Sequence, residues 1–245
     1  MSDLWRTTLI GFSTGIIGTG LGGSMAFLLN NPTKRFLSAI MGLSSGLMVA
    51  IVTFELLPEA FMIAGVPWTV VGLIGGVLIA TILDGFIARL SSRKHGGKHG
   101  YVKTAALLGI GIALHNFPEG MAIGSGFVAQ NRLGIGLAIV IALHNMPEGV
   151  AMVTPLRVGG YSRSKAFFLT LLAGTPMGIG AYFGALLGRV ADGFIGICLA
   201  FAGGTMLYIT FGELIPRGKE LDQGRISTIC ATFGFVLGML ISKRF

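Results

Sequence analysis

The 245-residue sequence has few charged residues, few cysteines and no long polar connection. Only 11% of its residues are charged, whereas about 25% is usual in soluble domains, and 53% are hydrophobic. The two cysteines, Cys198 and Cys230, both lie in apolar segments, which favours a packing role over a disulfide framework. This composition excludes an ordinary soluble globular domain.

Eight apolar segments account for most of the chain, and a bilayer-spanning helix needs about 20 such residues. They are residues 7–29, 36–57, 67–88, 104–129, 133–156, 166–188, 194–215 and 226–242. The longest connection between them covers only residues 89–103, which leaves no room for a separate soluble catalytic or nucleic-acid-binding domain. We therefore predict an all-α integral membrane protein with eight transmembrane helices, forming a single polytopic domain over residues 1–245.

The basic residues predict the orientation of this protein in the membrane. All 18 Lys and Arg residues lie outside the eight segments, scattered over short connections, so the net charge of +8 does not indicate nucleic-acid binding. If the N-terminus is outside, thirteen of them lie on the inner side. The positive-inside rule then places both termini outside, and we expect a prokaryotic inner membrane.

Two internal repeats relate different parts of the chain. Residues 113–122 (ALHNFPEGMA) match residues 142–151 (ALHNMPEGVA) at eight of ten positions. A shorter repeat relates residues 53–58 (TFELLP) to residues 210–216 (TFGELIP), and on its own it could be coincidence. Together they predict an inverted repeat of helices 1–3 and 6–8 around central helices 4 and 5, an arrangement typical of transporters.

The longer repeat places a histidine and a glutamate twice in the middle of the membrane. His115 and His144 are each the twelfth residue of their segment, roughly 16 Å into a core of about 30 Å. Glu119 and Glu148 follow four residues later, on the same helix face. Imidazole and carboxylate groups together suit a divalent transition metal such as Zn²⁺ or Fe²⁺.

A purely structural role for these groups, as hydrogen-bonded pairs between helices, is the alternative. One such pair would fit that role well. Two pairs at equal depth favour a functional site, because intramembrane carboxylates are costly. Pro118 and Pro147 also lie inside the helices, where each removes a backbone donor and frees a carbonyl oxygen beside the pair.

These motifs resemble those of a known family. The sequences His115-Asn116-Phe117-Pro118-Glu119-Gly120 and His144-Asn145-Met146-Pro147-Glu148-Gly149 are similar to the fourth- and fifth-helix metal motifs of the ZIP (Zrt/Irt-like) transporters, in particular the GufA/ZupT-like bacterial branch. The resemblance implies import of a divalent metal into the cytoplasm. Zinc is expected first, with iron, manganese, cobalt or cadmium as other candidates, and no cofactor beyond the transported ion.

The resemblance also implies which residues bind metal. The principal ligands would be Met48, His115, Glu119, His144 and Glu148. Met48 is also one of eleven methionines, most of which serve as core residues. A second site in the family uses the positions of Asn116 and Asn145, both bridging glutamates (Glu119 and Glu148) and a helix-6 glutamate. In place of the helix-6 glutamate this chain has Thr175, in Gly174-Thr175-Pro176. We therefore expect this second position to be weakly filled or empty.

Other polar residues have two interpretations each. Glu55 and Glu213 are each the twentieth residue of a 22-residue segment, and because the two segments run in opposite directions they lie near opposite faces of the membrane. They fit either entry and exit relays or carboxylates that reach the membrane surface. Asp84 and Glu59 fit the surface role better. His95 and His99 lie in a basic connection that resembles a metal-accepting loop, although a solvated connector explains them as well.

An intramembrane metalloenzyme is the alternative function. Neither motif is H-E-x-x-H, the zinc-protease pattern, because Asn116 and Asn145 occupy its second position. We therefore expect a transporter and not an enzyme. Divalent metal ions and bilayer lipid are the expected partners, and nucleic acid is not one of them. The sequence is compatible with a homodimer and does not determine the oligomeric state.

Overall fold

The computed structural model describes residues 2–28, 33–91 and 98–242, and every regular element among them is helical. This confirms the prediction of an all-α fold. The elements are α1 (Ser2–Leu28), α2 (Lys34–Ile51), the π-helix η1 (Val52–Leu56), α3 (Leu57–Ser91), α4 (Lys98–Ala129), α5 (Asn131–Val158), α6 (Arg163–Gly174), α7 (Pro176–Gly188), α8 (Asp192–Ile209), the π-helix η2 (Thr210–Leu214), α9 (Ile215–Leu221) and α10 (Ile226–Ser242).

Apolar side chains cover much of the outer surface of the helices. Trp68, Phe168 and Phe233 are each about three-fifths exposed, as are many leucines and isoleucines. A water-soluble monomer rarely exposes apolar area of this extent, whereas a lipid-facing surface requires it. Four helical runs in the described part of the chain are long and apolar enough to cross a membrane, namely residues 34–89, 131–154, 163–188 and 193–221.

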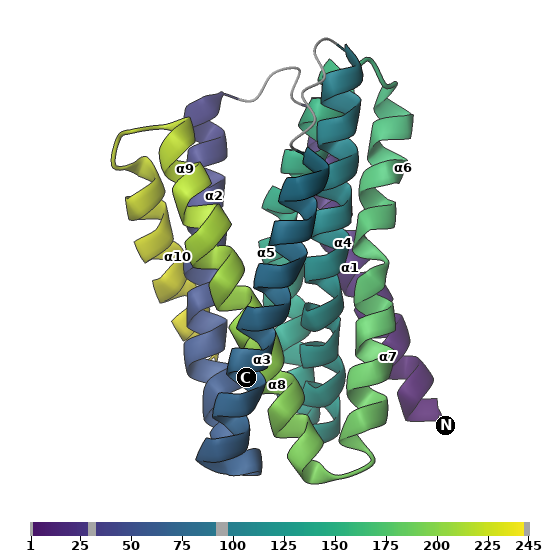
Figure 1. Cartoon of the computed structure of the whole chain (residues 1–245), viewed down its shortest axis with the longest axis vertical. Helices are drawn as coiled ribbons and strands as arrows, with labels where there is room; N and C mark the ends of the chain where they lie inside the picture. The colour runs from purple at the N-terminus through teal and green to yellow at the C-terminus, as the bar shows by residue number, and fades with distance from the viewer. Residues whose placement is uncertain (1, 29–32, 92–97, 243–245) are drawn as a thin grey trace.

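The helices pack as two groups that meet at α4 and α5 (Figure 1). In one group, α1 packs along α5 and α4 packs along α7, with α6 continuing α7 toward the other end. In the second group, α2 packs along α10 and α3 along α8. Contacts of α4 with α8 and of α5 with α2 join the two groups. The two helices that carry the long repeat therefore lie at the junction.

Glycines bring helix backbones into direct contact beside this junction. A Cβ atom at Gly120 of α4 would collide with the carbonyl oxygen of Met177 on α7, and one at Gly180 of α7 with that of Phe117 on α4. Small residues allow this approach between membrane helices, where van der Waals packing replaces the hydrophobic effect as the driving force. Gly120 follows Glu119 directly, so this contact fixes the position of α4 where the candidate ligands lie.

Two π-helical turns occur where the shorter repeat lies, and no sequence pattern predicts them. In η1 the N–H of Leu57 donates to the carbonyl oxygen of Val52, and in η2 the N–H of Ile215 donates to that of Thr210. A proline follows each turn at position 58 or 216, where it cannot donate to the helix. Single π-helical turns of this kind often accompany functional sites.

Three predicted segment boundaries are wrong. The helix predicted to end at residue 57 continues into α3 and is interrupted only at Gly65, whose φ of 71° is a conformation that favours glycine. The predicted segment 166–188 is divided at Thr175 into α6 and α7, because Pro176 begins a new helix. The predicted segment 194–215 extends through α9 to Leu221.

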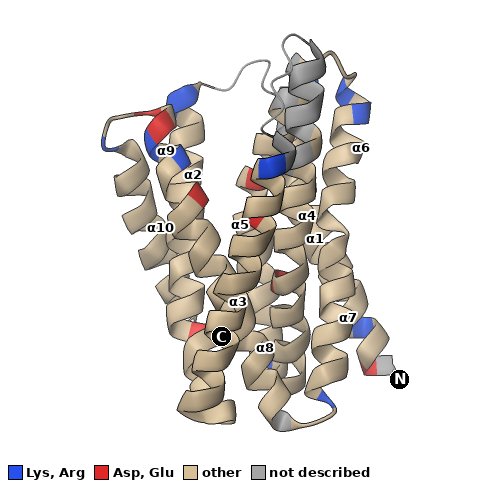
Figure 2. Cartoon of the chain, in the orientation of Figure 1, with Lys and Arg blue, Asp and Glu red and all other residues tan. Residues whose placement is uncertain are grey.

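Charged side chains are concentrated at the ends of the helices. Figure 2 shows most Lys and Arg residues at the end where α2, α6 and α10 begin and α9 ends. Among the described side chains, Arg6, Arg132 and Arg189 belong to the opposite end, near the start of α1, the start of α5 and the end of α7. The unequal distribution of basic residues that the sequence predicts is therefore a difference between the two ends of the folded molecule.

Candidate metal centre

Glu119 of α4 and His144 and Glu148 of α5 form a compact cluster. One ligand atom from each residue lies within 4.8 Å of the others. The Nε2 atom of His144 is 3.1 Å from Oε1 of Glu119 and 3.7 Å from Oε1 of Glu148. All three side chains are buried, with exposed fractions of 1%, 0% and 6% respectively. Three of the four candidate His and Glu ligands thus lie together, as predicted for neighbouring helices 4 and 5.

The cluster contains buried oxygen atoms without hydrogen-bond partners. Oε2 of Glu119 and Oε2 of Glu148 are two of them, and Oδ1 of Asn145 is a third. Each carboxylate faces His144 through Oε1 only, so its buried Oε2 atom loses hydration without a donor in return, which is unfavourable. Two carboxylates and one imidazole match the ligand types that zinc prefers. The residues present therefore fit a divalent cation as the missing partner.

The two asparagines connect helices beside the cluster. Nδ2 of Asn145 donates to Oδ1 of Asn116 at 3.0 Å, and Nδ2 of Asn116 donates to the carbonyl oxygen of Ala173 on α6 at 2.9 Å. Both side chains are fully buried. Asn116 therefore links α4 to α6 as well as to α5, next to His115 and His144 in the sequence.

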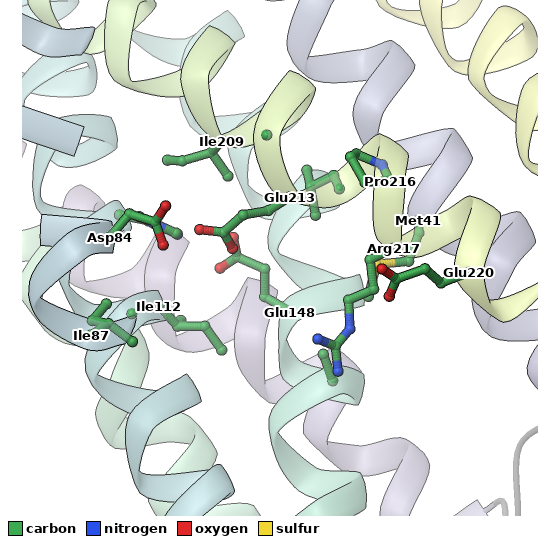
Figure 3. A pocket seen from close by; sticks show the side chains of 15 residues that line it. Met41, Asp84, Ile87, Ile112, Glu148, Ile209, Glu213, Pro216, Arg217 and Glu220 are labelled. Carbon is green, nitrogen blue, oxygen red and sulfur yellow. The ribbon is translucent and has the colours of Figure 1, made fainter. Parts of the chain in front are cut away.

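A cavity of about 420 Å³ extends from the cluster toward the end of the molecule that carries most basic residues. His115 and Glu148 line it, together with Asp84 of α3 and Glu213 of η2. Figure 3 shows the carboxylates of Asp84, Glu148 and Glu213 pointing toward one another, with Arg217 farther along. Acidic side chains thus continue from the buried cluster to this end of the helices.

Comparison with known proteins assigns this geometry to a family. The family model described as ZIP Zinc transporter matches residues 92–242. The chain belongs to the ZIP family. It is 32% identical over 243 residues to the zinc transporter ZupT of Corynebacterium aurimucosum, which covers 92% of this chain and 90% of that protein. It is 38% identical over 172 residues to the zinc transporter GufA of Myxococcus xanthus, covering 69% of this chain and 67% of that protein.

Similarity extends along nearly the whole chain in other relatives. The zinc transporter ZupT of Akkermansia muciniphila is 32% identical over 259 residues, covering 96% of this chain and 93% of that protein. The protein is thus an integral membrane transporter and not an enzyme, as the sequence motifs predicted. The metalloenzyme alternative has no support.

The remaining predicted ligands of this ZIP transporter are placed differently, and only His115 is among the residues that line the cavity. His115, one helical turn before Glu119, lies outside the three-residue group and lines the cavity. Met48 is buried, and its Sδ atom lies 3.3 Å from Oγ1 of Thr210, a hydroxyl that also lies 2.7 Å from the carbonyl oxygen of Met206 in its own helix and donates there. The hydroxyl of Thr175 donates to the carbonyl oxygen of Leu172 in its own helix, at 2.8 Å.

The predicted pathway residues are divided between two places. Glu213 lines the cavity, whereas Glu55 lies on η1 and is not among the lining residues. His95 lies outside the described residues, and so does the side chain of His99. Their suggested role in metal acceptance stays a prediction.

Sequence reasoning missed two contacts of this ZIP transporter. Asp84 was interpreted as a residue of the membrane surface, yet it lines the cavity and its Oδ2 accepts a hydrogen bond of 3.0 Å from the Tyr208 hydroxyl. Ser44 of α2 contacts the imidazole of His144. A signal for Ser44 was available, because it lies one helical turn before Met48 on the same helix face. The Tyr208–Asp84 contact joins segments far apart in sequence, and no local pattern predicts it.

Proposed function

We propose that this ZIP transporter imports zinc into the cytoplasm and that Glu119, His144 and Glu148 bind the ion in the middle of the membrane. The observation that carries this proposal is the pair of buried carboxylates with unpaired oxygens around one imidazole nitrogen. Zinc is the metal named for the relatives, and it suits the ligand types. Iron, manganese, cobalt and cadmium are competing substrates under this proposal.

His115 and Met48 complete the ligand set in our proposal. Zinc takes at least four ligands, and the cluster supplies three. His115 supplies the fourth, since it shares both a helix face with Glu119 and a cavity with Glu148. Met48 supplies a soft ligand, since its sulfur is buried and the neighbouring Thr210 hydroxyl donates to the Met206 carbonyl oxygen instead.

The proposal includes eight membrane-spanning helices in one domain, with helices 1–3 and 6–8 related as an inverted repeat. Counted as membrane helices, α6 and α7 together are helix 6, α8 to α9 are helix 7 and α10 is helix 8. The repeat exchanges helix 1 with 6, 2 with 7, 3 with 8 and 4 with 5. This exchange converts the α1–α5 pair into the α7–α4 pair. It likewise converts the α2–α10 pair into the α8–α3 pair. All four pairs are extensive contacts of the fold, and the shorter repeat lies on a π-helical turn in each half, which supports this symmetry.

Both termini face outward in this arrangement, and the acidic cavity opens toward the cytoplasm. The concentration of basic residues at the cavity end supports this orientation through the positive-inside rule. Asp84, Glu213 and Glu148 then form a path by which the ion leaves the cluster. Their negative charges stabilise a divalent cation as it regains its water shell.

Replacement of Glu119 by Gln tests the function directly. The variant keeps the shape of the side chain but removes one of the charges that balance the ion, so zinc uptake should fall at least about 100-fold, beyond the loss typical for an indirect contact. Uptake of radioactive zinc into a zinc-starved host is the measurement. Asp222→Asn, on the connection after α9, is the matched control and should retain uptake. Equal uptake by Glu119→Gln and wild type would refute the proposed site.

Labelling of single cysteines tests the orientation. Cysteines placed at Ser2 and, separately, at Arg225 should react oppositely with a membrane-impermeant thiol reagent applied to intact cells, because the two positions lie at opposite ends of the helices. Ser2 should react and Arg225 should not. Reaction only at Arg225 would reverse the orientation.

The substitution Thr175→Glu tests the weak second site. Asn116 and Asn145 offer only neutral oxygens there, and the Thr175 hydroxyl is a weak ligand, so wild type should bind close to one zinc ion per chain. A carboxylate at position 175 should raise the stoichiometry of purified protein toward two. Thr170→Glu, five residues earlier on α6 at a buried position, controls for added charge on the same helix. Two tightly bound ions in wild type would contradict this account.

A further inference from the structure

The imidazole of His144 is held on its far side by a hydroxyl from another helix. Oγ of Ser44 on α2 lies 2.5 Å from Nδ1 of His144 and 3.2 Å from the carbonyl oxygen of the same residue. Ser44 and His144 are at most 1% exposed. The ring therefore lies between the Ser44 hydroxyl at Nδ1 and the two carboxylates at Nε2.

The available hydrogen atoms determine how this contact works when metal is bound. A neutral imidazole carries one proton, so a metal at Nε2 requires that proton on Nδ1. Nδ1–H then donates to Oγ of Ser44, and the hydroxyl donates its own proton to the carbonyl oxygen of His144, which can only accept. Each donor has an acceptor, and the electron pair of Nε2 is directed at Glu119 and Glu148.

We infer that Ser44 is a positioning residue of the metal centre, which selects the form of His144 with a free Nε2 electron pair and holds the ring against the two carboxylates. The inference rests on the proposed metal centre. Groups that hydrogen-bond the second nitrogen of a metal-binding histidine in this way orient the ring and strengthen the ligand. Ser44 lies on α2, which packs along α10, and so the helix group that does not carry Glu119, His144 and Glu148 supplies this contact.

The neighbouring residue Ser45 has the hydrogen bond that is usual for a buried hydroxyl in a helix, and Ser44 does not. Ser45 is equally buried, and its hydroxyl donates at 2.7 Å to the carbonyl oxygen of Met41 in its own helix. Most buried serine and threonine hydroxyls in the described helices do the same, which is the common pattern for membrane helices. Ser45 is therefore a matched control for Ser44 at the same depth, with the same chemistry and without contact to the imidazole.

Zinc binding to purified full-length protein, measured by titration calorimetry, separates the two serines. Ser44→Ala should weaken zinc binding by about 10-fold to 100-fold, the range for contacts that act through a ligand. Ser45→Ala should bind as wild type does. The fitted number of sites per chain should stay the same in Ser44→Ala, which distinguishes a weaker site from a misfolded fraction. Equal affinity in wild type and Ser44→Ala would overturn the inference.

Nitrogen NMR of the histidines gives a readout that needs no variant. The chain has only four histidines, so labelled imidazole signals are few, and a His144→Gln sample identifies those of residue 144. In zinc-loaded wild type we expect Nε2 of His144 bound to zinc and Nδ1 protonated. Zinc on Nδ1 would overturn the role of Ser44 while leaving the metal centre intact. His144 signals that do not respond to zinc would overturn both the inference and the proposed centre.

Discussion

The metal centre depends on two carboxylates that are buried in an apolar interior. Glu119 and Glu148 face one imidazole, and each has an oxygen without a hydrogen-bond partner. Such an arrangement is unfavourable unless a cation completes it, because the surroundings offer neither water nor enough donors. The two carboxylates are thus stable in their charged form only while a cation lies beside them. That requirement connects the structure of α4 and α5 to transport.

Close helix packing holds these charges in place. Glycines let α4 approach α7 until backbones touch beside Glu119, and Asn116 links three helices next to the cluster. The second helix group reaches the cluster through α2, whose Ser44 contacts His144. It also supplies Glu213 from a π-helical turn and Asp84 from α3 at the cavity. One group therefore holds the principal ligands, and the other supplies most of the acidic side chains that face the path away from them.

Much of this arrangement could be predicted from the sequence, for physical reasons. Helices were predictable because apolar runs of membrane length have no other stable form in lipid. The Glu119, His144 and Glu148 cluster was predictable because a spacing of four residues places side chains on one face, and the motif occurs twice at equal depth. The helix break at Gly65, the two π-helical turns and the hydrogen bonds of Ser44 and Tyr208 were not, since they depend on backbone conformation or on contacts between distant segments.

The most direct test of the account is to locate the ion. Crystals grown with zinc, with diffraction recorded on either side of the zinc absorption edge, would show the position of the metal independently of any change to the protein. The account predicts the strongest anomalous peak among Nε2 of His144 and the carboxylates of Glu119 and Glu148. Zinc found only elsewhere, with these three side chains still paired to one another, would contradict the central claim.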